Sequence, residues 1–303
     1  MEDSRRYLDP KVLNRVERLD LRARLIVEGF LAGRHRSPSK GFSVEFAEHR
    51  EYATGDDLRY LDWKVYGKSD RLYVKQYEEE TNLVATVCLD ASTSMHYEAP
   101  ERATLSKYDY AATVAASLAY LVVHQQDAAG IVLFDDEVRE KLPAGSQPIH
   151  LHRILALMET FRGGPRTNIA DSLGEVAEKI RRRGLVVIVS DLLDDAERVL
   201  AGLRRLRRRR HDVVVFHVLD EDETSFPFGK MTSFEGTEEP SADLLCDPPA
   251  LRAAYLEALE EFRRRVRAGC LAERIDYVPL DTATPLDVAL SGYLARRESS
   301  VRS

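Results

Sequence analysis

The stretch Leu-Val-Ala-Thr-Val-Cys-Leu-Asp-Ala-Ser-Thr-Ser-Met at residues 83–95 decides the fold. Its first seven residues are mostly apolar and rich in β-branched side chains, the pattern of a strand buried on both faces. The strand runs into Asp90, Ser92 and Ser94, whose oxygens are the hard donors that Mg²⁺ or Mn²⁺ prefers. In an open parallel sheet, ligands bind beyond the carboxyl ends of the strands. The stretch therefore predicts a site at the mouth of an α/β sheet.

The same residues would also suit a simple helix start, because Asp and Ser are common in turns and at helix N-caps. Two other segments favour a site. A loop rich in glycine and proline, residues 162–168, carries Thr167 ahead of a helical pattern, and a second apolar strand, residues 184–190, ends at Asp191. Oxygen donors of one chemical type at these places predict one site for Mg²⁺ or Mn²⁺. The predicted ligands are Asp90, Ser92, Ser94, Thr167 and Asp191.

In order and spacing, these five residues resemble the metal-ion-dependent adhesion site of the von Willebrand factor A domain, which follows the pattern Asp-x-Ser-x-Ser, then Thr, then Asp. The resemblance implies a Rossmann-type α/β fold. Three of the ligands are neutral hydroxyls, so only two carboxylates offset the charge of the ion. Because Mg²⁺ is seldom enclosed entirely by protein, a vacant position could accept an acidic side chain from a protein partner.

Strand and helix patterns alternate after residue 81, which predicts a doubly wound, mostly parallel sheet. Residues 221–247 interrupt this rhythm and predict an irregular surface excursion. Ahead of the sheet, apolar residues recur at helical spacing between residues 12 and 30, and half-buried strands are predicted near residues 44–46 and 72–76. We therefore expect an N-terminal arm at residues 1–80 and a von Willebrand factor A-like domain at residues 81–298. The arm's helix should pack on the chain's own core, with a groove on a partner as the alternative.

The arm carries a second resemblance. It contains the motifs Glu45-Phe46, Arg50, Tyr52, Gly55-Asp56-Asp57, Arg59, Asp62-Trp63 and Glu80, which are followed by the strand and Asp-x-Ser-x-Ser. Together these motifs look like the bacterial family called domain of unknown function 58. That resemblance covers about residues 35–295. It implies an adaptor that works beside a MoxR-type AAA+ ATPase in assembling or remodelling a protein complex. Many members begin with two transmembrane helices, and no such segment is present here, so we expect no membrane insertion.

The charges of the arm alternate in sign, which favours a salt-bridged clasp that holds the arm on the sheet. The alternative is a docking surface that presents Trp63, Arg59 and Arg50, residue types enriched at interface hot spots. Elsewhere, the arginine run at residues 204–210 lies on the polar side of an amphipathic helix and is interpreted as a solvated face.

Composition limits the function further. The net charge of −7 argues against general nucleic-acid binding, and three cysteines without metal spacing suit reduced thiols in a cytoplasmic protein. We expect a non-enzymatic, metal-dependent protein-binding module. The alternative is a metal-dependent hydrolase that acts on a phosphoester or similar substrate, for which His96 is the obvious general base.

Overall fold

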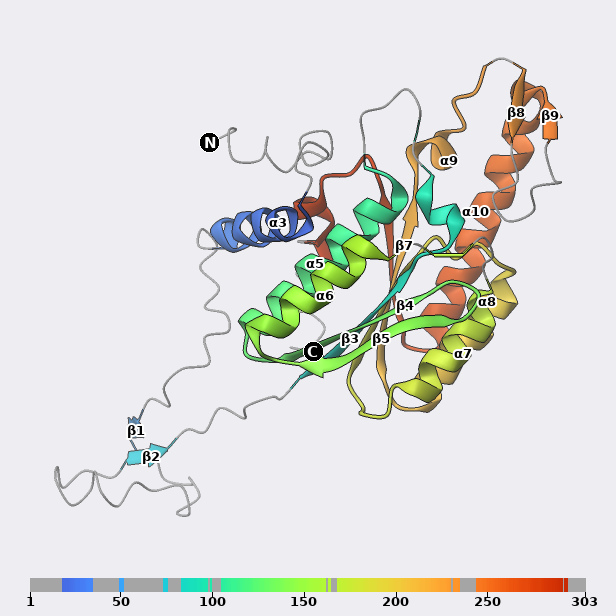
Figure 1. Ribbon diagram of the computed structural model, residues 1–303. Helices are drawn as coiled ribbons and strands as arrows, with labels where there is room; N and C mark the ends of the chain where they lie inside the picture. Colours follow the sequence, from blue (N-terminus) through green and yellow to red (C-terminus); the bar gives the residue numbers. More distant parts are fainter. Residues whose placement is uncertain are drawn as a thin grey trace. The chain divides into compact units, whose positions relative to one another are not determined.

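The computed structural model describes residues 18–34, 49–51, 73–75, 83–97, 99, 105–161, 163–164, 168–229, 231–234, 244–290 and 292–293. The chain divides into two compact units (Figure 1). One unit comprises Met1–His35 with Leu83–Ser303 and contains the main sheet. The other comprises Arg36–Asn82.

The main sheet has the strand order β10-β7-β6-β3-β4-β5. Every neighbouring pair is parallel except β4 with β5, which is antiparallel. The strands are β3 (Val84–Asp90), β4 (Ala128–Phe134), β5 (Val138–Gly145), β6 (Leu185–Ser190), β7 (Asp212–Leu219) and β10 (Asp276–Asp281). The predicted α/β fold with a doubly wound, mostly parallel sheet is confirmed.

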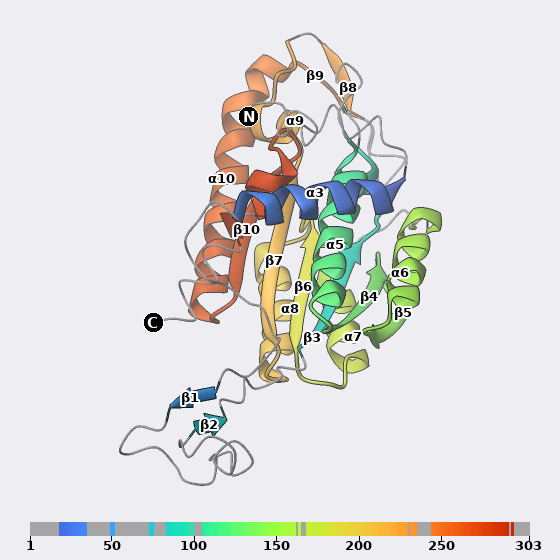
Figure 2. The same cartoon turned by 90° about the vertical axis from the view of Figure 1, so that its left-hand side faces the viewer.

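Helices cover both faces of this sheet (Figure 2). One face carries α3 (Leu19–Arg34), α5 (Lys107–His124) and α6 (Pro148–Thr160), and the other carries α7 (Ile169–Lys179), α8 (Ala196–Arg208) and α10 (Pro248–Ala272). Alternate side chains of β3 enter the two apolar cores: Val87 and Leu89 lie on one face and Cys88 on the other. This division explains why the strand is apolar throughout.

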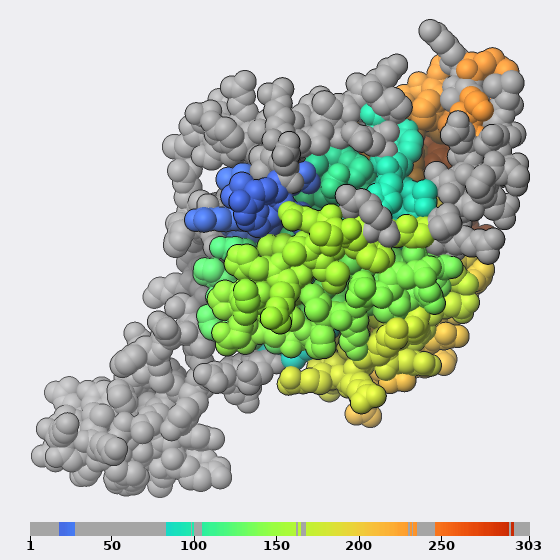
Figure 3. Space-filling model, viewed as in Figure 1, coloured from blue at the N-terminus to red at the C-terminus, as the bar shows by residue number. Residues whose placement is uncertain are grey.

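The helix predicted in the arm is present as α3, and it packs on the sheet unit. Ala23 and Ile26 are fully buried in the same apolar core as α5. The helix also contacts α6, beside which it lies on the face shown in Figure 3. Packing on the chain's own core is therefore confirmed for α3, and its burial there leaves these side chains inaccessible to a partner.

The unit of residues 36–82 is described only at β1 (His49–Glu51) and β2 (Tyr73–Lys75), which pair antiparallel with Arg50 opposite Val74. The predicted strand at residues 44–46 lies outside the described residues, and the division into an arm of residues 1–80 and a domain of residues 81–298 stays a prediction. Among the described residues, no helix combines the length and apolarity needed to cross a bilayer.

Short elements fill the carboxyl end of the sheet. They are the 3₁₀ turn η2 (Thr93–His96), the short helix α9 (Glu221–Ser225) and the antiparallel pair β8 (Thr232–Phe234) and β9 (Leu244–Cys246). The predicted excursion at residues 221–247 thus begins with a helical turn and contains a small ribbon. Turn η2 follows β3 directly and contains the predicted ligand Ser94. Helix α9 follows β7, which is parallel to β6, so α9 lies at the same end of the sheet as Asp191.

Candidate metal centre

The candidate site lies where β3 and β6, adjacent parallel strands, end side by side. Asp90 is the last residue of β3 and is fully buried. One carboxylate oxygen accepts a hydrogen bond from the backbone N–H of Ser92 at 3.0 Å, and the other accepts from the Ser190 hydroxyl at 2.6 Å. The carboxylate of Asp90 is thus fixed by a donor from its own loop and a donor from the neighbouring strand.

Hydroxyl groups connect Asp90 to the second aspartate. The Oγ atoms of Ser92 and Ser94 lie 3.1 Å apart, and both residues are buried. Ser94 in turn hydrogen-bonds the carboxylate of Asp191. The structure therefore brings four of the five predicted ligands into one hydrogen-bonded chain.

The fifth predicted ligand, Thr167, lies outside the described residues, but the start of its loop is described. Gly163 lies so close to Ala91 that a Cβ built on it would be 1.6 Å from the Ala91 carbonyl oxygen. The Gly164 carbonyl accepts from the Thr93 hydroxyl at 3.0 Å, and its N–H donates to Asp135 at 2.7 Å. The loop that carries Thr167 therefore begins against the loop that carries Ser92 and Ser94.

A buried lysine, absent from the prediction, completes the chain of contacts. The ammonium of Lys107, at the start of α5, donates to Asp191 at 2.8 Å and to Glu223 of α9 at 2.9 Å. Lys107 is only 2% exposed. Burial is the largest single influence and would raise the pKa of Asp191, but the charge of Lys107 and the hydrogen bonds to the carboxylate together outweigh it and lower that pKa. Burial likewise opposes the charged form of Lys107, yet Asp191 and Glu223 raise its pKa.

The balance of charge at the site is negative. Burial, reinforced by the charge of Asp191, raises the pKa of Asp90 to about 7. Burial also raises the pKa of Glu223. With all groups ionised, Asp90, Asp191 and Glu223 exceed the single charge of Lys107 by two. An uncompensated buried charge is costly, so a divalent cation beside Asp90 would relieve this excess. The donor set of carboxylate and hydroxyl oxygens suits Mg²⁺ or Mn²⁺.

Helix α9 is tied to the site by acidic side chains. Its capping box joins Asp220 and Glu223, and Tyr97, just after η2, donates its hydroxyl to Asp222 at 2.8 Å. Asp220 also accepts from the Thr282 hydroxyl at 2.7 Å. These two further buried carboxylates add to the negative charge around the site.

Behind the site, a buried histidine fixes the backbone of Asp191. Nε2 of His217 lies 2.9 Å from the Asp191 carbonyl oxygen, and Nδ1 lies 2.6 Å from the Tyr277 hydroxyl. A carbonyl only accepts, so Nε2 carries the proton and Nδ1 accepts from Tyr277. Burial lowers the pKa of His217 to about 4, which keeps the ring neutral. The following residue, Leu192, has a φ of 54° and turns the chain sharply after Asp191.

The other predicted functional residues are less fully described. Trp63 and Arg59 lie outside the described residues, and only the backbone of Arg50, in β1, is described. His96 is exposed, and its ring centroid lies 4.9 Å from that of Tyr108. The hydrolase alternative stays an untested prediction. Within the described residues, no three His, Cys, Asp or Glu side chains are grouped as metal ligands.

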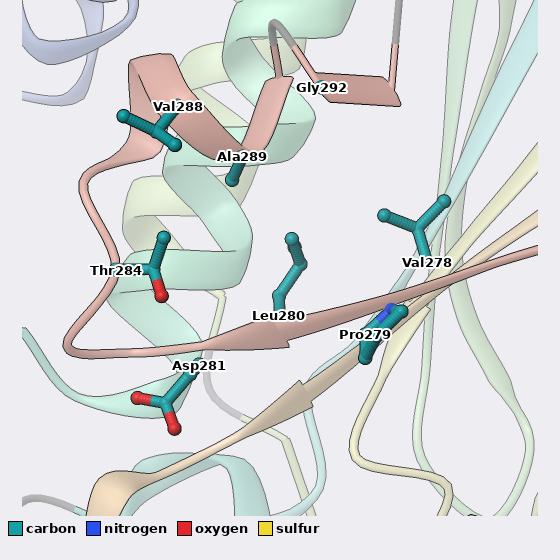
Figure 4. A pocket seen from close by; sticks show the side chains of 8 residues that line it. All are labelled: Val278, Pro279, Leu280, Asp281, Thr284, Val288, Ala289 and Gly292. Atoms are coloured by element: carbon teal, nitrogen blue, oxygen red, sulfur yellow. The ribbon is translucent and has the colours of Figure 1, made fainter. Parts of the chain in front are cut away.

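A groove of about 360 Å³ lies along the edge strand β10 (Figure 4). It is lined by Val278, Pro279, Leu280, Asp281, Thr284, Val288, Ala289 and Gly292. Its acidic residue, Asp281, is already engaged by the Thr224 hydroxyl at 3.0 Å and the Ala283 N–H at 2.9 Å. The groove contains no predicted site residue.

Sequence patterns could have revealed one of the residues that the prediction missed. Ser190 is a polar residue at the end of an otherwise apolar strand, directly before Asp191, and this contrast marks it as part of the site. Nothing comparable marks Lys107, whose partners lie 84 and 116 residues further along the chain.

Comparisons with known proteins find a matching family and several similar chains. The family described as "Protein of unknown function DUF58" matches residues 48–265. An uncharacterized protein of Mycobacterium tuberculosis is 27% identical over 270 residues, covering 86% of this chain and 83% of that protein. Among solved structures, the conserved hypothetical protein BatB from Bacteroides thetaiotaomicron is 14% identical with a TM-score of 0.43, covering 72% of this chain and 99% of that one. An aerotolerance-related membrane protein from Bacteroides fragilis is 15% identical with a TM-score of 0.43, covering 71% and 99%.

Proposed function

This chain belongs to the DUF58 family, and we propose that it is a non-enzymatic protein-binding module whose binding depends on Mg²⁺ or Mn²⁺. The observation that carries the proposal is the buried chain of oxygen donors from Asp90 to Asp191, in which negative charge exceeds positive charge. Ser92 and Ser94 would be hydroxyl ligands, with Thr167 as the fifth donor. A bound ion would offer a coordination position to one carboxylate of a partner protein.

Lys107 gives the two aspartates different roles in this proposal. Asp191 already holds an ammonium at 2.8 Å, so its charge is largely satisfied. Asp90 accepts only from neutral groups at its carboxylate, whereas Asp191 and Glu223 share the ammonium of Lys107. Asp90 is therefore the principal anionic ligand, and Asp191 orients Ser94 through their hydrogen bond. Because only one ligand is then an uncompensated anion, the site favours a further acidic side chain from outside.

The resemblance to the family supports the choice of partner. We propose a MoxR-type AAA+ ATPase, with this chain as an adaptor in the assembly or remodelling of a protein complex. The three cysteines, Cys88, Cys246 and Cys270, are free thiols, which suits the reducing cytoplasm proposed as the site of action.

The metal site is tested by calorimetric titration of the full chain with Mg²⁺ and Mn²⁺. Asp90→Asn keeps the shape of the side chain but removes its charge, so we expect the binding heat to disappear while the far-ultraviolet circular dichroism stays unchanged. Ser92→Ala combined with Ser94→Ala should weaken binding strongly. Glu178→Gln, which removes an exposed carboxylate from α7, is the matched control and should bind like wild type.

Capture of the ATPase is tested separately. Chelation of divalent ions should weaken its binding at least about tenfold, equivalent to about 1.4 kcal/mol. Asp90→Asn protein that binds metal as tightly as wild type would contradict the metal site. If calorimetry detects metal binding but capture of the ATPase does not depend on the metal, only the proposed partner is rejected.

A further inference from the structure

Exposed arginines gather at the end of the sheet opposite the candidate metal centre. Residues 181–183 and 204–210 hold nine arginines and no acidic residue, although the whole chain has a net charge of −7. The two runs precede β6 and β7, adjacent parallel strands, so they meet at the amino end of the sheet, away from α9 (Figure 1). Nε of Arg183 donates to the backbone carbonyl of Arg210 at 2.9 Å, which places the runs in direct contact.

We call the exposed members of these runs the arginine face. They are Arg181, Arg182, Arg183, Arg205, Arg208, Arg209 and Arg210. Neighbouring carboxylates are engaged by other arginines: Glu273 lies 3.3 Å from Arg204, and Asp212 lies 3.8 Å from Arg207. Among the residues that the structure describes, no carboxylate forms an ion pair with a member of the arginine face.

The stability of helix α8 does not require this concentration of positive charge. Helix α8 is held by its buried residues, among them Leu200, Leu203 and Leu206, and its exposed positions could carry charges of either sign. Helix α10 shows the usual arrangement, since Arg264 and Arg265 both pair with Glu261 of the same helix. Like charges on adjacent loops repel one another, so the arginine face opposes folding slightly. An anionic partner would turn this repulsion into attraction.

The shape and chemistry of the face favour carboxylates. The guanidinium fork binds a carboxylate through two parallel hydrogen bonds. The two runs contain no aromatic residue on which a nucleic-acid base could stack. A long polyanion such as duplex DNA, or an extended anionic membrane, would also meet the rest of the chain, which is acidic because the whole chain has a net charge of −7 despite these arginines. A short acidic peptide can contact the arginines alone.

We propose that the arginine face is a second protein-docking surface, which binds a short acidic segment of a partner protein. It acts independently of the metal centre because it lies at the opposite end of the sheet and uses no residue of that site. The domain would thereby contact partners at both ends of its sheet, through a cation at one end and through arginines at the other.

The probe is a fluorescein-labelled octaglutamate peptide, titrated against the full chain by fluorescence anisotropy in chelator and low salt. The test variant is Arg182→Glu with Arg208→Glu and Arg209→Glu, chosen because these exposed side chains span both runs. The matched control makes the same charge change on α10, with Arg264→Glu, Arg265→Glu and Arg267→Glu. We expect the test variant to bind at least about tenfold more weakly than wild type, and the control to change affinity less than about threefold.

Raising the salt concentration should weaken wild-type binding because exposed ion pairs are screened. Equal losses in the test variant and the control would mean that net charge alone governs binding, which overturns the proposal. Absence of peptide binding to wild type overturns it as well. Parallel titrations with a duplex oligonucleotide and with phosphatidylglycerol vesicles complete the test, since stronger binding of either one would assign the face to a different class of partner.

Discussion

The two ends of the sheet carry opposite charges in opposite surroundings. At the carboxyl end, Asp90 and Asp191 are buried, Glu223 is partly buried, and each charge has defined contacts. At the amino end, the arginine face is exposed to water and makes no described ion pair. Because buried charges interact strongly while exposed ones are screened, the first end should govern stability and the second should govern encounters with partners. The same kind of substitution should therefore have very different effects at the two ends.

The largest effect is expected from Lys107→Met. This change leaves the buried carboxylate of Asp191 and the partly exposed one of Glu223 without their cation, and breaking a buried ion pair such as that with Asp191 costs about 3–5 kcal/mol. The measurement is the free energy of unfolding in urea without divalent ions. Lys179→Met is the control, because Lys179 pairs with Glu175 at 2.6 Å on the surface, where such pairs contribute about 0–1 kcal/mol. If Lys107→Met lowers the free energy of unfolding no more than Lys179→Met does, the ion pairs of Lys107 contribute little to stability.

Lys107 also shows where prediction from the sequence ends. Strand periodicity and the Asp-x-Ser-x-Ser pattern suffice to predict the sheet and the clustering of Asp90, Ser92, Ser94 and Asp191, because both are local or repeat along the chain. The role of Lys107 depends on the first turn of α5 reaching the ends of β6 and β7, which no local pattern encodes. The arginine face is similar, since its two runs look like separate solvated segments until the adjacent strands β6 and β7 bring them together.

An intermediate effect, dependent on pH, is expected from His217→Gln. The pKa of His217 is lowered from 6.5 to about 4, so the folded state excludes a proton that the unfolded state binds. The contribution of the neutral ring is therefore present above pH 6.5 and is lost as the pH falls toward 4. At 1.36 kcal/mol per pKa unit, this amounts to about 3 kcal/mol. Urea unfolding of wild type and variant at several pH values measures it, and the stability difference between them should shrink as the pH falls.

The comparison with the variant is needed because Asp90 acts in the opposite direction. Its folded pKa is raised from 3.8 to about 7, so its contribution is present below pH 3.8 and is lost as the pH rises through 7. Wild type alone therefore reports the sum of two opposed changes. At the amino end, burial also lowers the pKa of His211, so His211→Gln should give a change of the same sign. If the difference in unfolding free energy between wild type and His217→Gln does not vary with pH, His217 titrates freely despite its burial.

The smallest effect is expected at the arginine face, where two weak contributions oppose one another. Arg208 lies in the last turn of α8, where a cation interacts favourably with the helix dipole, so Arg208→Glu should cost about 0.3–1 kcal/mol at low ionic strength. Arg182 lies outside the helices, so Arg182→Glu removes only repulsion and should stabilise by a few tenths of a kcal/mol, roughly. The two single variants should therefore differ in sign, and the triple variant used for peptide binding should stay within about 0.5–1 kcal/mol of wild type. Urea unfolding at about 0.02 M and 0.5 M sodium chloride measures these differences, and the higher salt should reduce both. A loss of several kcal/mol in the triple variant would show that the arginine face, like the opposite end of the sheet, is held by specific internal contacts, and it would then be unavailable for docking.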